Sequence, residues 1–145
     1  MVNVGLKAAI IAALLAGSSA VAEPETAATP LQVADAQELA DLAAQVALCW
    51  RAPRGQDGAA IRVVLAIDLD RDGRFIPSPR LVEPAGATAP GEATAYDNAR
   101  RAILRCGGGG FDLAPAAYES WKTLELDFEA DRVTARPRAA THRAA

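Results

Sequence analysis

The stretch IRVVLAIDL, residues 61–69, decides the fold of this chain. Its apolar side chains recur at every second position, which is typical of a strand that buries one face in a core. No proline or glycine interrupts the run, so it can pair with a neighbour on each side, and we predict a central strand. Its inner face consists of Ile61, Val63, Leu65, Ile67 and Leu69.

A hairpin turn and a second extended run follow this strand directly. Residues 70–73 read Asp-Arg-Asp-Gly. Asp-Gly between two apolar runs predicts a β-hairpin, because glycine accepts the positive φ of a tight turn. Pro77 and Pro79 lie in the second run, residues 74–82. Because proline cannot donate a hydrogen bond to a neighbouring strand, we expect this run at an edge of the sheet.

One helix is predicted before the hairpin. Asp35 and Glu38 fit a capping box, in which Asp35 is the N-cap and Glu38 reaches back from the third helical position. An apolar stripe at helical spacing follows and ends before Pro53, so we expect one face of this helix to pack on the sheet. The stripe consists of Leu39, Leu42, Val46, Cys49 and Trp50.

A second helix and a third strand are predicted after the hairpin. The helix runs from about Thr94 to Cys106, and glycines at 107–110 end it. Residues 121–128, WKTLELDF, alternate as a strand does. The order helix-strand-strand-helix-strand predicts an α+β fold with a three-stranded antiparallel sheet and two helices on one face. The third strand fits beside the first, which gives the strand order 2-1-3 and leaves the third strand as an exposed edge.

The N-terminal segment predicts export. Lys7 precedes an apolar run at 8–16, and the alanines at 20 and 22 fit an A-x-A site, so residues 1–22 are expected to be a signal peptide cleaved after Ala22. An uncleaved membrane anchor is the alternative, but the run is shorter than the ~20 residues that span a bilayer. The mature chain is then expected outside the cytoplasm, with no transmembrane span. The remaining divisions are a flexible lead-in at 23–34, a folded domain at 35–130, and a disordered, Arg- and Ala-rich tail at 131–145.

Charge and residue types argue against two classes of function. The formal net charge is −3 and no Lys/Arg cluster stands out, whereas nucleic-acid binding needs concentrated positive charge. The single histidine, His142, lies in the predicted tail, and Ser78 and Ser120 have no evident base partner. We therefore expect no nucleic-acid partner, no enzymatic activity and no cofactor.

Cys49 and Cys106 are the only cysteines, and each ends a predicted helix on its apolar side. Export and an even number of cysteines favour a disulfide between them. A redox or metal-binding pair is the alternative, but neither C-x-x-C spacing nor a nearby histidine supports it.

Asp68, Asp70 and Asp72, followed by Gly73, match the opening of an EF-hand calcium loop. Position twelve of such a loop must supply a bidentate glutamate, but Pro79 stands there, and strands rather than helices flank the motif. We interpret it as a polar hairpin turn without a metal. A small secreted calcium-binding domain that uses this turn is the alternative function.

Several segments, taken in order, resemble one family. The segments are Cys49-Trp50, Asp72-Gly73, YDNARRAILRC at 96–106, PAAYESW at 115–121 and LDF at 126–128. Together they resemble the TonB/TolA C-terminal domain family in its TolA-like periplasmic form, over about residues 35–130.

The resemblance implies a periplasmic module that binds envelope proteins by pairing its third strand with an extended segment, with links to Tol-Pal or TonB-dependent transport. The family's energy transducers have a membrane anchor and a long spacer, so a free-standing module is expected here. Partners are then periplasmic or outer-membrane proteins. The expected partner-binding edge consists of Trp121, Thr123, Glu125 and Asp127.

Overall fold

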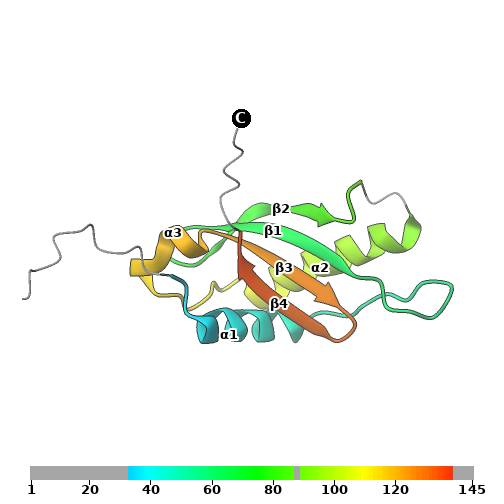
Figure 1. The fold of residues 1–145 in the computed structure, drawn as a ribbon, viewed down its shortest axis with the longest axis horizontal. Helices are drawn as coiled ribbons and strands as arrows, with labels where there is room; N and C mark the ends of the chain where they lie inside the picture. The colour runs from blue at the N-terminus through cyan, green and yellow to red at the C-terminus, as the bar shows by residue number, and fades with distance from the viewer. Residues whose placement is uncertain (1–32, 87–88, 139–145) are drawn as a thin grey trace, which may run out of the picture.

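The computed structural model describes residues 33–86 and 89–138. The predicted signal peptide with its cleavage site, most of the predicted lead-in and the end of the predicted tail lie outside these ranges. In chain order, the elements are α1 (Ala36–Ala47), β1 (Val63–Leu69), β2 (Phe75–Glu83), α2 (Pro90–Gly107), the 3-10 turn η1 (Pro115–Ala117), α3 (Tyr118–Trp121), β3 (Thr123–Glu129) and β4 (Arg132–Pro137) (Figure 1).

The strands form one antiparallel sheet in the order β2-β1-β3-β4 (Figure 1). β1 lies inside the sheet, where Leu65 pairs with Leu81 of β2 on one side and with Leu126 of β3 on the other. β2 lies at an edge, as its prolines predict. The predicted α+β class and the relative order of these three strands are therefore confirmed.

The predicted number of strands is wrong, because β4 covers the outer side of β3. The two strands pair from Glu129 opposite Arg132 to Leu124 opposite Pro137. β4 lies within residues 131–145, the segment that its composition predicts to be a disordered tail. The third strand is therefore an interior strand, and β4 takes its place at the edge.

β4 escapes prediction because its sequence signal is weak. Val133 and Ala135 are its only residues that pack on the core, and the others are polar or exposed. The turn that leads into it contains no glycine: Ala130 itself adopts a φ of 44°. A short run with two modest apolar residues and no turn signature gives sequence reasoning little to detect.

Both long helices cover the same face of the sheet. Alternate residues of β1, including Val63 and Leu65, share one core cluster with apolar side chains of α1 and α2. The intervening Val64 and Ala66 are buried but belong to the opposite face. Within the layer, α1 packs against β4 and α2, whereas α2 packs against β1 and β2.

The helix starts differ in part from the prediction. Asp35 caps α1 by accepting hydrogen bonds from the N–H groups of Gln37 at 2.7 Å and Glu38 at 3.2 Å. The Glu38 carboxylate does not reach back but accepts from the Ala114 N–H at 3.2 Å, so it links α1 to a distant loop. α2 begins at Pro90 rather than Thr94, because proline is favoured in the first helical turn.

Candidate functional site

The predicted binding strand is not available as an edge. The backbone of β3 pairs with β1 on one side and with β4 on the other, over residues that include Thr123, Glu125 and Asp127. Trp121 lies at the end of α3, fully buried, and its indole N–H donates to the Ala114 carbonyl at 2.8 Å. The prediction that these four residues form an exposed edge is therefore wrong.

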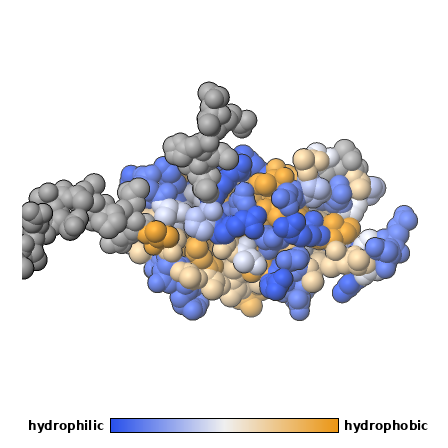
Figure 2. All heavy atoms as spheres, viewed as in Figure 1, coloured by the Kyte–Doolittle hydropathy of each residue, from blue (hydrophilic) through white to orange (hydrophobic). Residues whose placement is uncertain are grey.

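The side chains of β3 instead join a network of ion pairs on the open face of the sheet. Arg62 holds the mostly buried Asp127 carboxylate with two hydrogen bonds of 2.9 and 2.7 Å, and Arg62 also contacts Glu83. These bonds raise the pKa of Arg62, with Asp127 as the main cause. Arg136 of β4 donates to Glu125 at 2.9 Å. In Figure 2, hydrophilic side chains lie over the strands, with hydrophobic ones between them.

Two aspartates of the predicted polar turn, Asp68 and Asp70, bond to other groups of the chain. Asp68 accepts from Arg80 and from the Thr123 hydroxyl, and the bond to Arg80, followed by that to Thr123, lowers the pKa of Asp68. Asp70 accepts from the N–H groups of Asp72 and Arg74, both at 2.9 Å. Within residues 33–86 and 89–138, no three His, Cys, Asp or Glu side chains gather as a metal ion would need.

The outer edge of β4 carries unpaired backbone groups. In an antiparallel ladder, hydrogen-bonded pairs alternate with non-hydrogen-bonded pairs. The Arg138 N–H donates to the Thr123 carbonyl at 2.9 Å, so this pair and every second pair from it along β3 and β4 are the hydrogen-bonded ones. The N–H and C=O groups of Val133 and Ala135 consequently point away from β3. Pro137, which has no N–H, takes the next outward position. The residues of β4 that bond to β3 are Arg132, Thr134 and Arg136.

A shallow groove of about 490 Å³ runs along this edge between β4 and α1. Small side chains of α1 form one wall, and β4 forms the other. Because alanine side chains are short, they leave room beside the strand for the side chains of another chain. The α1 wall consists of Ala36, Ala40, Ala43, Ala44 and Ala47.

The opposite edge, β2, lacks such a row of free donors. Pro77 and Pro79 have no N–H to offer. The Tyr96 hydroxyl of α2 donates to the Pro79 carbonyl at 3.1 Å, so one acceptor at this edge is also occupied. β2 is therefore a poor template for a further strand.

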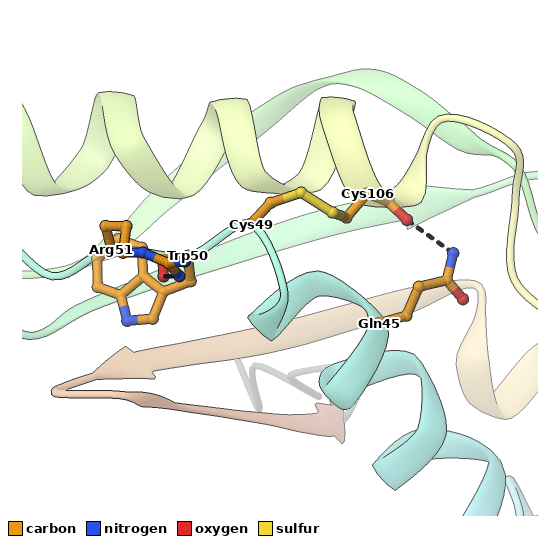
Figure 3. Close-up of a disulfide and its surroundings, with 5 residues drawn as sticks. All are labelled: Gln45, Cys49, Trp50, Arg51 and Cys106. Carbon is orange, nitrogen blue, oxygen red and sulfur yellow. Dashed lines mark hydrogen bonds between the residues drawn. A yellow bond between two sulfur atoms is a disulfide. The ribbon is translucent and has the colours of Figure 1, made fainter.

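The predicted disulfide is confirmed. Cys49 and Cys106 are bonded, with their Cα atoms 6.0 Å apart, and the bond joins the chain just after α1 to the last turn of α2 (Figure 3). Gln45, which sequence reasoning missed, donates from its amide to the carbonyls of Cys106 at 2.7 Å and Gly110 at 3.3 Å. The two helices are thus held together covalently and by a polar cap.

Trp50 connects this junction to the turn between β3 and β4. Its indole N–H donates to the Ala130 carbonyl at 3.0 Å, and its ring lies edge-on to Phe128 with centroids 5.0 Å apart. The placement of Trp50 as a core anchor was predicted; its bond to the turn was not, because Ala130 is eighty residues away.

Comparison of the chain with protein-family models, with curated proteins and with solved structures finds no match in any of the three. The TonB/TolA resemblance therefore stays a prediction. In the part of the chain that the structure describes, no helix combines the length and the apolar character needed to cross a membrane.

Proposed function

We propose that this chain is a protein-binding module of TonB/TolA C-terminal type that adds an extended segment of its partner to β4. The observation that supports this proposal most directly is that the N–H and C=O groups of Val133 and Ala135 point away from β3, beside a groove lined by alanines. Strand addition satisfies such groups with main-chain hydrogen bonds, and side-chain contacts give selectivity. The binding mode is the one that the resemblance implies, moved from β3 to β4.

The partners belong to the cell envelope. This follows from the predicted export signal and from the resemblance, which favours periplasmic or outer-membrane proteins, in the context of Tol-Pal or TonB-dependent transport. The disulfide supports the same compartment, because such bonds persist in oxidising surroundings.

The surfaces on the two sides of the β4 edge favour different residue types at alternate positions of the partner strand. Side chains opposite Val133 and Ala135 face the alanine wall of α1, where apolar residues are favoured. Side chains on the other face lie beside Arg132 and Arg136, which are exposed at 69% and 50% of their side-chain surface. Arg132 already pairs with Glu129 and Arg136 with Glu125, so hydroxyl or other polar residues that share these guanidinium groups suit the positions. The partner strand therefore alternates apolar and polar residues.

A second copy of the chain fits this edge poorly. The antiparallel register that uses both Val133 and Ala135 in each copy places Arg132 opposite Arg136 of the second copy. Like charges directly opposite each other in a sheet are destabilising. The charge on β4 therefore favours a different chain over self-association.

The test begins with peptides selected from a displayed library of random extended sequences on the full-length exported protein. The selected peptides are then titrated against Ala135→Pro. Proline removes an outward N–H that β3 does not use, so the fold is kept and peptide binding falls about tenfold or more. Circular dichroism checks the fold.

Ile76→Ala on the exposed part of β2 serves as the control and leaves peptide affinity unchanged. If folded Ala135→Pro binds the selected peptides as the natural sequence does, or if selection yields no peptide at all, β4 is not a strand-addition site.

A further inference from the structure

A second surface feature lies beside the disulfide. It is a hollow of about 200 Å³ with three guanidinium groups and no carboxylate among its lining residues. In a chain with a formal net charge of −3, such a local excess of positive charge stands out. The lining residues are Cys49, Arg51, Asn98, Arg101 and Arg105.

Only the tertiary structure brings these arginines together. Arg101 and Arg105 lie one turn apart on α2, with Asn98 in the preceding turn. Arg51 follows α1 and is brought to them by the bond between Cys49 and Cys106. The amide of Asn98 also donates to the Arg51 carbonyl at 3.2 Å. The expectation that the chain has no arginine cluster is therefore wrong at this place.

The positive charge of the hollow is only partly balanced. Arg101 pairs with Asp97, whose carboxylate also binds Arg100. Arg51 donates to the neighbouring Trp50 carbonyl at 2.7 Å (Figure 3). Arg105 makes no hydrogen bond or ion pair with any described residue. Most donor groups of Arg51 and Arg105 are therefore free.

The helix dipole accounts for only part of this arrangement. Arg105 lies in the last turn of α2, where a positive charge is favourable, but a helix C-terminus carries only about half a negative charge. Gln45 already satisfies the carbonyls of Cys106 and Gly110 there. Three guanidinium groups exceed what this terminus requires.

We propose that this hollow binds one phosphate-type anion. Guanidinium groups match the oxygens of a phosphate with paired, charge-assisted hydrogen bonds. The hollow has room for a phosphate group. Free phosphate and the phosphomonoester headgroup of a lipid share this chemistry. The disulfide positions Arg51, so reduction of the bond weakens the site.

The experiment titrates inorganic phosphate into the full-length oxidised protein and follows the NMR signals of the Asn98 amide and the arginine Nε groups. These signals shift saturably, and affinity falls about tenfold or more in Arg101→Ala/Arg105→Ala. The matched control, Arg71→Ala/Arg74→Ala, removes the same charge from the exposed turn between β1 and β2 and keeps the affinity. Arg101→Lys/Arg105→Lys keeps the positive charge but lacks the paired N–H donors of the guanidinium groups, so this variant binds phosphate with intermediate affinity.

A second arm uses vesicles of phosphatidylcholine with and without phosphatidic acid. Binding that requires phosphatidic acid and the two α2 arginines identifies a headgroup, whereas saturation by free phosphate alone identifies the soluble anion. The proposal is overturned if phosphate causes no saturable shift, or if the control variant loses as much affinity as the α2 variant. Neither arm depends on peptide binding at β4.

Discussion

The two edges of the sheet differ in what their backbones offer to another chain. At β2, Pro77 and Pro79 lack N–H groups, and Tyr96 occupies the Pro79 carbonyl. At β4, the N–H and C=O groups of Val133 and Ala135 point outward beside a groove.

The contrast shows how one sheet can prevent strand pairing at one edge and still allow a partner strand to pair at the other. Exposed edges promote aggregation, and proline is one of the ways in which natural proteins block them. Here the blocked edge and the open edge are supported by different helices, α2 for β2 and α1 for β4. Changes that affect one side more than the other are therefore informative.

The largest expected effect comes from separating these two helices. Cys49→Ala with Cys106→Ala removes a bond that closes a loop across 57 residues, which lowers the free energy of unfolding by about 4 kcal/mol on chain entropy. Denaturant unfolding of the full-length protein measures the loss. Amide exchange should rise first in the β4 amides that bond to β3, because α1 packs mainly on β4 and α2, whereas α2 keeps its packing on both β1 and β2 without the disulfide. Equal rises at β2 and β4 would contradict the idea of separate support.

A smaller change loosens the open edge alone. Trp50→Phe removes the hydrogen bond to the Ala130 carbonyl but keeps an aromatic ring beside Phe128. We expect a loss of about 1 kcal/mol, because the carbonyl must find another partner. Exchange at the β3–β4 hairpin should increase while β2 keeps its protection. If amide exchange increased equally throughout the sheet, the Trp50 hydrogen bond would not specifically stabilise the β3–β4 hairpin.

The smallest effect concerns the side of β2 and depends on pH. Arg80 of β2 lowers the pKa of Asp68 in the folded protein. A depressed folded-state pKa gives stability that is present above the ordinary aspartate pKa of about 3.9 and is lost as pH falls through the lower folded value. Because both side chains are more than one-third exposed, Asp68→Asn should cost only about 0.5 kcal/mol at pH 7. The difference from the natural sequence should vanish in acid, and a difference that persists there would rule out the ion pair as its cause.

Sequence reasoning located the elements with strong local signals. The alternation at residues 61–69 predicted β1, the prolines predicted β2 as an edge, and helix-end cysteines predicted the disulfide. It failed on the candidate site, because the edge at Thr123 was inferred from a sheet that lacked β4. One undetected strand was enough to turn a predicted edge into an interior strand.

The sequence by itself determined the α+β class, the central strand and the pairing of Cys49 with Cys106, since period, turn residues and cysteine count are local or countable properties. The tertiary structure alone decided which strand is the free edge and which arginines meet beside the disulfide. Val133 becomes part of a strand because α1 and Phe128 bury it, and Arg51 meets Arg105 because two helices are joined. The packing of α1 on β4 and the meeting of Arg51 with Arg105 both join segments far apart in the chain, which no local pattern records.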